Sequence, residues 1–523
     1  MARVLVTEKI AQPGLDQLAA AGHEVDIQLD LTPEQLLEVI VGAHALIIRS
    51  ATTVTAEVLE AGRDLVVVGR AGIGLDNVDV VRATELGVMV VNAPQSNIVS
   101  AAEQAMALLL AQARNIPQAH SALVAGKWER SKWEGVELYE KTLAIIGLGR
   151  IGALVAQRAL AFGMTLIAYD PFVSAERAKL MGIEMVSLDE ALARADFITI
   201  HLPKNKETIG LLNAETLAKT KKGVRIINAA RGGIVDEAAL ADAIRSGHVG
   251  GAGIDVFEKE PTTESPLFEL SSVVVAPHLG ASTAEAQDKA GATIADMVEL
   301  ALAGDFVPFA VNIAAGDVSE MVRPFMGLAE QLGRFVGGLV DESPSKVDIG
   351  FHGELAGTGT GILTLSVLKG LLGSHSDEPV SYVNAPAIAE SRGLEIDETS
   401  SVTSHDFVNL ITVSAGGHSV AGTLTGIGNR IEPRIVSVDG HALELSPAAH
   451  MLVVRNDDRP GMIGVVGTAL GNAEISVDSM AVSPSAEAGT ALMVLSTAEA
   501  LADDVIAGLV GSAGIQAVHR IEL

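Results

Sequence analysis

Three side chains with complementary chemistry lie directly after predicted strands. Arg231, Glu260 and His278 each follow an apolar run that is typical of a buried strand. A histidine has a suitable pKa to take the proton of a hydroxyl group, and an acid on its other ring nitrogen fixes the tautomer. An arginine beside them can hold a carboxylate through two parallel bonds. Together they predict a catalytic set for oxidation of a hydroxy acid, whereas His201, also at a strand end, has no equally placed acid and is interpreted as structural.

A glycine pattern earlier in the chain predicts the binding site of a cofactor for this chemistry. The strand pattern Thr142–Ile146 is followed by Gly147-Leu-Gly149-Arg-Ile-Gly152, by an alanine-rich helix pattern, and by a second strand that ends in Asp170. Gly147 would allow the tight turn, Gly149 would let a pyrophosphate approach the backbone, and Gly152 would let helix and strand pack closely. The free amides at the start of the helix would hold the phosphates. Asp170 would bind the ribose hydroxyls and repel a 2′-phosphate, so we predict NAD rather than NADP.

Two arginines and a second glycine-rich loop belong to the first hundred residues. Arg49 and Arg70 each end a predicted strand, on the side from which an anionic substrate would be held. The loop that continues from Arg70 through Gly72 and Gly74 lacks the third glycine of the nucleotide pattern. It can be an ordinary turn or a loop whose amides hold a small anion, and the spacing leaves both interpretations open.

Composition excludes several functional classes. The formal charge of −29 in 523 residues argues against a nucleic-acid or anionic-membrane partner. The lack of cysteine excludes disulfides and thiolate chemistry, and no histidine pair has the spacing of a metal site, so we expect no metal. The N-terminal residues resemble a strand rather than a signal peptide, and the longest weakly polar run, Leu355 to Gly373, carries Lys369 and is a poor membrane span. We therefore expect a soluble, cytoplasmic protein.

The order of strand and helix patterns predicts an α/β chain in several parts. Residues 1–98 alternate strands and helices, and so does the region around the glycine pattern, which predicts two Rossmann-like, doubly wound sheets. Ser100-Ala-Ala-Glu has the spacing of a capping box and would begin a long helix between them. A helix from about 282 to 302 would return to pack on the first part. The chain then changes to an α+β pattern, and residues 450–523 have the order βαββαβ of a ferredoxin-like unit.

At these residues the chain resembles the D-isomer-specific 2-hydroxyacid dehydrogenases, in particular their long form. The resemblance covers nearly the whole chain and is carried by the segments Arg49–Thr52, Arg70–Asp79, Gly147–Gly152 with Asp170, Asn228–Glu237, Asp255–Pro261 and Pro277–Thr283. It implies a discontinuous substrate-binding domain (1–98 and 284–312), an NAD-binding Rossmann domain (99–283), an intervening allosteric-type domain (313–447) and an ACT regulatory domain (448–523).

The resemblance also implies a reaction and its residues. The reaction is NAD-dependent oxidation of 3-phospho-D-glycerate to 3-phosphohydroxypyruvate, the first step of L-serine biosynthesis, with a proton relay through a His–Glu pair. The residues that match the family's catalytic set are Arg231, Glu260 and His278, and Arg49, Arg70 and Gly72 fall in its substrate-binding region. The residues that would contact NAD are Gly147, Gly149, Arg150, Ile151, Gly152, Asp170, Ala229, Ala230, Asp255, Leu279, Gly280 and Ala281.

Assembly and regulation are expected from the same resemblance. It implies a homo-oligomer, a tetramer, with an amino-acid effector bound at the ACT domain. Ser476 stands where serine-binding ACT domains usually have asparagine, so ordinary inhibition by serine is not expected. Two alternatives stay open: another D-2-hydroxyacid dehydrogenase, such as a hydroxypyruvate or glyoxylate reductase, and an NAD-sensing regulatory protein that has lost its chemistry. The intact set of Arg231, Glu260 and His278 argues against the second alternative.

Overall fold

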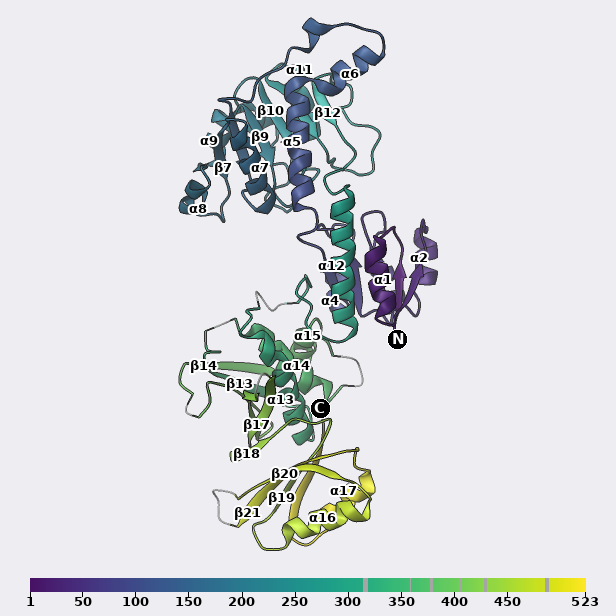
Figure 1. Cartoon of the computed structure of the whole chain (residues 1–523), viewed down its shortest axis with the longest axis vertical. Coiled ribbons are helices and arrows are strands. Elements are labelled where there is room, and N and C mark those ends of the chain that lie inside the picture. The colour runs from purple at the N-terminus through teal and green to yellow at the C-terminus, as the bar shows by residue number, and fades with distance from the viewer. Residues whose placement is uncertain (314–317, 358, 377–379, 405, 428–429, 485–488) are drawn as a thin grey trace.

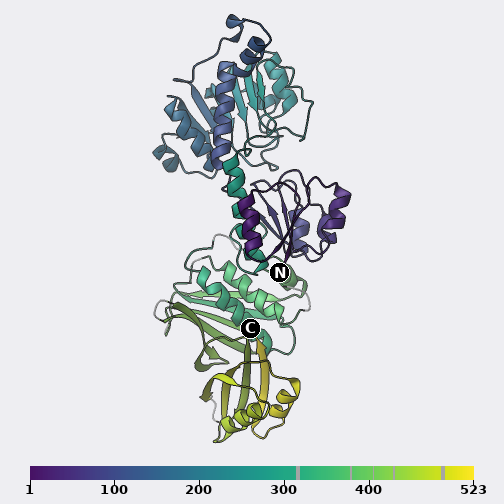
Figure 2. The same ribbon diagram turned by 45° about the vertical axis from the view of Figure 1, so that its right-hand side comes forward.

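In the described part of the chain, four β-sheets, each with its own helices, follow one another along the long axis of the molecule (Figures 1 and 2). The computed structural model describes residues 1–523 except 314–317, 358, 377–379, 405, 428–429 and 485–488. The spatial order differs from the chain order: the sheet built on the glycine pattern lies at one end, and the first sheet lies between it and the third (Figure 1).

The first sheet contains β1 (Arg3–Val6), β2 (Glu24–Ile27), β3 (Ala45–Ile48), β4 (Val67–Arg70) and β5 (Met89–Asn92). Its strands are parallel in the order β2-β1-β3-β4-β5. The central strands are short apolar runs because both of their faces are buried. The helices are α1 (Gln12–Ala20), α2 (Pro33–Val39), α3 (Ala56–Ala61), α4 (Val80–Glu85) and, from much later in the chain, α12 (Ala284–Leu302).

Helix α12 joins the core of the first sheet. Its Ala290, Ile294 and Val298 are buried in one cluster with residues of β1 and β3. A Cβ on Gly14 of α1 would lie 2.6 Å from the carbonyl oxygen of Gly291, so the two helices cross closely. We call β1–β5 with α1–α4 and α12 the first unit.

The sheet built on the glycine pattern contains β6 (Thr142–Ile146), β7 (Thr165–Tyr169), β8 (Glu184–Met185), β9 (Phe197–Ile200), β10 (Val224–Asn228), β11 (Val249–Ile254) and β12 (Val273–Val275). All strands are parallel in the order β12-β11-β10-β9-β6-β7-β8, so the order reverses between β6 and β9, where a doubly wound sheet opens its ligand crevice. Its helices, which with the sheet form the nucleotide unit, are α5 (Ile98–Arg114), α6 (Ile116–Val124), η1 (Arg130–Trp133), α7 (Arg150–Ala161), α8 (Ala175–Leu180), α9 (Leu188–Arg194), α10 (Ala214–Ala218) and α11 (Glu237–Arg245).

The capping-box prediction at Ser100 was wrong. Helix α5 begins at Ile98, and its N-cap Asn97 makes no side-chain cap bond. Ser100 lies inside the first turn, where its hydroxyl is 2.8 Å from Oγ1 of Thr283. The hydroxyl contacts a residue far away in the sequence, and a rule based on local spacing cannot predict such a contact.

The third sheet contains β13 (Lys346–Gly353), β14 (Glu395–Ser401), β15 (Asn409–Ala415), β16 (His418–Ile427), β17 (Arg430–Val438) and β18 (His441–Leu445). Its order is β14-β13-β15-β16-β17-β18, and all neighbours are antiparallel except the parallel pair β13 and β14. Its helices, which with the sheet form the third unit, are η2 (Arg323–Phe325), α13 (Met326–Leu339), α14 (Gly361–Gly373) and α15 (Ala385–Ser391).

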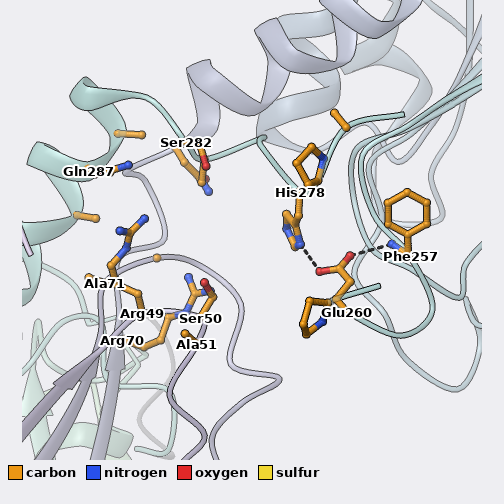
Figure 3. A pocket seen from close by; sticks show the side chains of 18 of the residues that line it. Arg49, Ser50, Ala51, Arg70, Ala71, Phe257, Glu260, His278, Ser282 and Gln287 are labelled. Atoms are coloured by element: carbon orange, nitrogen blue, oxygen red, sulfur yellow. Dashed lines mark hydrogen bonds and ion pairs between the residues drawn. The ribbon is translucent and has the colours of Figure 1, made fainter. Parts of the chain in front are cut away.

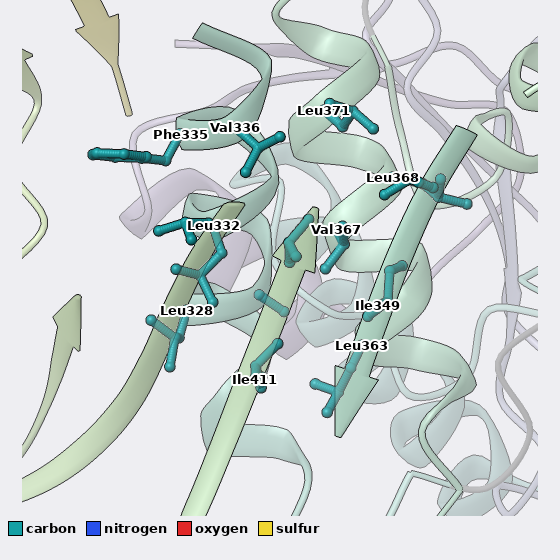
Figure 4. Packing of buried hydrophobic residues seen from close by; sticks show 14 of the residues in the cluster. Leu328, Leu332, Phe335, Val336, Ile349, Leu363, Val367, Leu368, Leu371 and Ile411 are labelled. Atoms are coloured by element: carbon teal, nitrogen blue, oxygen red, sulfur yellow. The ribbon is translucent and has the colours of Figure 1, made fainter. Parts of the chain in front are cut away.

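Helices α13 and α14 cover this sheet and form its core (Figure 4). The weakly polar run from Leu355 to Gly373 contributes α14, which is buried along most of its length, while its residue 358 lies outside the described residues. A Cβ on Gly333 would overlap the carbonyl of Val367, so glycine lets the two helices approach each other closely. No helix in the described ranges is long and apolar enough to span a membrane.

The C-terminal unit contains β19 (His450–Asp457), α16 (Met462–Asn472), β20 (Val477–Pro484), β21 (Thr490–Thr497), α17 (Asp503–Val510) and β22 (Ile515–Glu522). Its antiparallel sheet has the order β20-β21-β19-β22. Side chains alternate along β19: Leu452 and Val454 pack under the two helices, whereas Met451 and Val453 face the core of the third unit. The predicted fold class, two doubly wound sheets followed by an α+β part and a βαββαβ unit, is confirmed.

Candidate active site

A cleft of about 630 Å³ is lined by residues of both the first and the nucleotide units (Figure 3). The nucleotide unit contributes Glu260 and His278 to its wall, and the first unit contributes Arg49 and Arg70. Arg49 follows β3 directly and Arg70 is the last residue of β4. Figure 3 shows the two arginines across the cleft from the histidine. The strand ends therefore bring an acid, an imidazole and two cations to one cavity.

The side chains of Glu260 and His278 form a short, direct pair. Nδ1 of His278 lies 2.5 Å from Oε2 of Glu260, and Oε1 of Glu260 accepts a 2.8 Å bond from the amide of Phe257. Burial raises the pKa of Glu260, but the bonds from His278 and Phe257 and the nearby charges of His278 and Arg231 outweigh it, and the pKa lies below its usual value. The carboxylate is therefore ionised, and Nε2 is the imidazole nitrogen available to a substrate.

The buried carboxylate of Asp255 holds the backbone that carries His278. It accepts bonds from the amides of Leu279 (2.9 Å) and Gly280 (2.8 Å) and from Nε2 of Gln104 (3.1 Å). The carbonyl oxygen of Asp255 accepts the amide of His278 at 2.7 Å, and His278 has a left-handed φ of 55°. Burial raises the pKa of Asp255. Asp255, Leu279 and Gly280, predicted to contact NAD, thus form one hydrogen-bonded group beside the base.

The three glycines of the nucleotide pattern have three different environments. Gly147 has φ +98°, and a Cβ there would lie 2.6 Å from the carbonyl oxygen of His201. A Cβ on Gly152 would overlap the carbonyl of Gly147, so only glycine lets helix α7 start against the strand. A Cβ on Gly149 would meet nothing within 4 Å. The open space at Gly149 fits a pyrophosphate, which would meet the amides that the first turn of a helix leaves without intrahelical partners.

Asp170 lies at the end of β7 and contacts the same turn. Its Oδ2 accepts the amide of Leu148 at 2.8 Å, and its Oδ1 accepts the amide of Phe172 at 2.9 Å. A carboxylate has about four lone-pair positions, so both oxygens can still accept a ribose hydroxyl. Asp170 therefore stabilises the glycine turn as well as fitting the ribose role that the sequence predicted.

The remaining residues predicted to contact NAD lie at the same sheet edge. Arg150 opens α7 and is exposed, and Ile151 is half-buried beside it. Ala229 and Ala230 follow β10, where the amide of Ala230 donates to the buried side chain of Asn228 at 3.1 Å. Ala281 lines the cleft.

Arg231 lies beside the cleft rather than on its wall. Its Nη1 donates to the carbonyl of Ala230 at 2.8 Å, and its Nε is 3.4 Å from Oδ2 of Asp76, a residue of the glycine-rich loop of the first unit. Its charge still reaches Glu260, whose pKa it lowers. The structure thus pairs Glu260 directly with His278 and places Arg231 next to them, turned toward the first unit.

The cation side of the cleft is built around Arg70. Burial, followed by the positive charge of Arg231, lowers the pKa of Arg70, while Glu8 and Asp76 act in the opposite direction. Its Nε is buried with no hydrogen-bond partner in the described part of the chain. Gly72 also lines the cleft, and a Cβ there would overlap the guanidinium of Arg70. A buried guanidinium with an unused donor fits an anionic ligand.

Sequence reasoning missed several polar residues of this cleft. Asn97, Ser282 and Gln287 line it, and Oδ1 of Asn97 is buried without a partner in the described residues. Ser282 stands within the recognised segment 277–283, which could have indicated it. Asn97 and Gln287 carry no such signal, because each looks like an ordinary polar residue at or near the start of a helix. Burial lowers the pKa of His201 to about 4, and its Nε2 lies 2.9 Å from Oγ1 of Thr199.

Comparison with known proteins identifies the family. A D-3-phosphoglycerate dehydrogenase of Mycobacterium bovis is 48% identical over 525 residues, which cover 99% of each chain. The chain belongs to the D-3-phosphoglycerate dehydrogenase family. Other D-3-phosphoglycerate dehydrogenases are similar along nearly their whole length: that of Synechocystis is 42% identical, covering 100% of this chain and 95% of the relative, and that of Bacillus subtilis is 39% identical, covering 100% of both.

Three family models match this member of the D-3-phosphoglycerate dehydrogenase family, and each matched range contains all or most of the strands of one of the last three sheets in chain order. The NAD-binding domain of D-isomer-specific 2-hydroxyacid dehydrogenases matches residues 106–280, the D-3-phosphoglycerate dehydrogenase intervening domain matches 321–439, and the ACT domain matches 450–507. The first match contains the glycine pattern, Asp170 and His278. The chain is therefore an NAD-dependent oxidoreductase with intervening and ACT domains, as the resemblance implied.

Solved structures match the first part of this dehydrogenase. A protein from Thermus thermophilus has a TM-score of 0.56 and 34% identity, covering 59% of this chain and 99% of its own. An NAD-dependent formate dehydrogenase from Staphylococcus aureus in complex with NAD has a TM-score of 0.52 and 32% identity, covering 57% of this chain and 95% of its own. The first and nucleotide units thus share their arrangement with dehydrogenases of this class.

Proposed function

We propose that the chain oxidises 3-phospho-D-glycerate to 3-phosphohydroxypyruvate with NAD, the first step of L-serine biosynthesis. The observation that supports it is the ionised Glu260 bound to His278 on one wall of a cleft whose opposite wall carries Arg49 and Arg70. A base with an acid behind it suits alcohol oxidation, and two cations suit a phosphate group. Relatives of matching length are named for this activity.

Each side chain takes a separate part of the proposed reaction. Nε2 of His278 takes the proton of the substrate's 2-hydroxyl, and the carboxylate of Glu260 on Nδ1 stabilises the imidazolium that results. Arg231 offers positive charge for the substrate carboxylate and the developing carbonyl.

Other residues of the cleft would bind the cofactor and the phosphate group of the substrate. NAD, when bound, accepts the hydride from C2, and the residues to hold it are the turn Gly147–Gly152, Asp170, the Ala229–Ala230 pair and the segment from Asp255 to Ala281. Arg49 and Arg70, with Gly72 beside them, face the phosphate group.

A direct assay tests this proposal. NADH formation is followed by absorbance with 3-phosphoglycerate and, in parallel, with unphosphorylated D-glycerate. We expect turnover with the first and at least a hundredfold lower kcat/KM with the second, because Arg49 and Arg70 would lose their phosphate partner. A preference for unphosphorylated acids, or for hydroxypyruvate or glyoxylate in the reverse direction, would assign the chain to the alternative reductases. No turnover with NADH still bound would assign it to the NAD-sensing class.

The base is tested by replacing it. His278→Asn should abolish turnover and leave the affinity for NADH within twofold of wild type, because the side chain lies on the substrate side of the cleft. Undiminished turnover would remove His278 from the proton-transfer role.

The division into a substrate-binding domain (1–98 and 284–312), an NAD-binding domain (99–283), an intervening domain (313–447) and a regulatory domain (448–523) is part of the same proposal. We further propose a cytoplasmic homotetramer whose ACT domain binds an amino-acid effector. Asn456 supports a ligand there, since its side chain is buried and its Oδ1 has no partner in the described residues. Light scattering tests the tetramer, and titration of activity with single amino acids, serine included, tests the effector.

A further inference from the structure

One carboxylate holds the turn that carries Arg49. Oε1 of Glu8, the second residue after β1, accepts the amides of Arg49 at 2.8 Å and Thr52 at 2.9 Å. The amide of Ala51 lies 3.1 Å from both carboxylate oxygens. Three backbone donors of one irregular turn therefore converge on a single side chain, although Glu8 is more than forty residues away in sequence.

A second side chain, that of Asn77, binds the carbonyl groups of the same turn. Nδ2 of Asn77 donates to the carbonyl of Arg49 at 2.9 Å and to that of Thr52 at 2.6 Å. Glu8 thus binds the amides of the turn, and Asn77 binds its carbonyls. The backbone of Arg49 depends on these two side chains, because strand β3 has already ended at Ile48.

The guanidinium of Arg49 has little support of its own. Its Nη1 makes a 3.5 Å contact with the carbonyl of Lys9, a weak interaction at the limit of hydrogen bonding. The point from which Arg49 reaches into the cleft is therefore set by its backbone, which Glu8 and Asn77 hold. Because Glu8 determines that backbone, a change at Glu8 is transmitted to the cation that faces the substrate.

Glu8 itself stands outside the cleft. It lines a second cavity of about 600 Å³, which shares Arg49 and Ala51 with the cleft. Glu8 is half-buried, and its negative charge is directed at the amides. It would not touch a substrate held between Arg49 and His278.

We propose that Glu8 is a positioning residue that aims Arg49 at the phosphate end of the substrate. The inference rests on the proposed function, since it assumes that Arg49 binds the substrate anion.

Removing the negative charge of Glu8 has two opposing effects on substrate binding. Loss of the carboxylate would make the cleft more positive, but it would also release three amides from charge-assisted bonds, and short bonds outweigh a charge that water screens.

The variant Glu8→Gln separates these effects. Its amide oxygen can replace Oε1 and still accept the amides of Arg49 and Thr52, but without the negative charge. Its NH2 group stands where Oε2 faces the amide of Ala51, so two donors oppose each other there and the turn is held less firmly. We expect KM for 3-phosphoglycerate to rise about tenfold, the factor for one lost bond to a charged group, with kcat and NADH affinity within twofold. Glu57→Gln is the matched control: it removes a carboxylate from the wall of the same second cavity without a contact to the turn, and KM should not change.

A double-variant cycle tests the route through Arg49. If Glu8 acts through Arg49, Glu8→Gln should add less than twofold to KM in an Arg49→Ala background. A full tenfold effect in that background, or a lowered KM in Glu8→Gln alone, would overturn the proposal. Glu8→Asp keeps the charge with a shorter reach, so it should also raise KM and provides the test if Glu8→Gln does not fold. An unchanged KM in Arg49→Ala itself would refute the anion-binding role of Arg49, not the contacts of Glu8.

Discussion

Replacement of Gly149 by alanine should separate nucleotide binding from folding. Gly149 caps helix α7 with φ −72° and ψ −160°, a conformation that alanine adopts, and its Cβ would meet nothing within 4 Å. The folded protein should therefore change in stability by less than about 1 kcal/mol, because the stiffer unfolded chain offsets part of the cost of alanine as an N-cap residue. The new methyl group would instead occupy the space into which a pyrophosphate must approach the helix amides.

The size of the binding defect follows from those amides. Losing one or two hydrogen bonds to a charged phosphate costs about 1.5–3 kcal/mol each, so NADH should bind at least tenfold more weakly to Gly149→Ala. Gly152→Ala is the control that should disturb folding itself, because its Cβ would overlap the carbonyl of Gly147. Overpacking of that kind costs about 1–3 kcal/mol, and this variant should lower the unfolding temperature as well as the affinity.

Fluorescence titration with NADH and thermal unfolding measure the two effects independently. Wild-type NADH affinity in Gly149→Ala would mean that the pyrophosphate does not lie at this turn. An unfolding temperature as low as that of Gly152→Ala would mean that the space beside Gly149 is not open.

Two further predictions concern the titratable side chains Glu260 and His201. Glu260→Gln removes the charge that stabilises the imidazolium of His278, so kcat should fall by about a hundredfold with NADH affinity retained, and an undiminished kcat would contradict the relay. Burial lowers the pKa of His201 from 6.5 to about 4, so as pH falls through this interval the unfolded chain takes up the proton first and the folded protein loses stability. His201→Gln should unfold with a weaker pH dependence between pH 6.5 and 4 than wild type, as thermal unfolding at several pH values would measure, and an equal dependence would argue against a neutral, buried imidazole.

Local rules predicted those parts of the site whose geometry is local. The turn at Gly147 needs a positive φ, and the crossing at Gly152 needs a missing Cβ, so the residue types alone carried the information. Strand β6 was predicted with its observed bounds, Thr142–Ile146, because a buried parallel strand is a nearly continuous apolar run. The clustering of Glu260 and His278 followed from strand ends that meet at one sheet edge.

Contacts between distant segments could not be predicted in this way. Ser100 had the spacing of a cap, but its hydroxyl lies against Thr283, which only the folded chain brings near. The turn of Arg231 toward Asp76 depends on how two sheets face each other, and no residue pattern encodes it. The contacts of Glu8 likewise arise only when β1 and β3 pair.

The same bond between Ser100 and Thr283 has a mechanical consequence. The backbone passes between the two units that form the cleft through 93–97, between β5 and α5, and again through 279–283, before α12. The bond at 2.8 Å joins the ends of these two crossings, so they act as one narrow joint. Relative motion of the units is then restricted to rotation about that joint, with Asn97 and Ser282 close to the axis. These two polar side chains would keep their places whether the enzyme is open or shut, whereas Arg49 and Arg70, on the first unit, would move relative to His278.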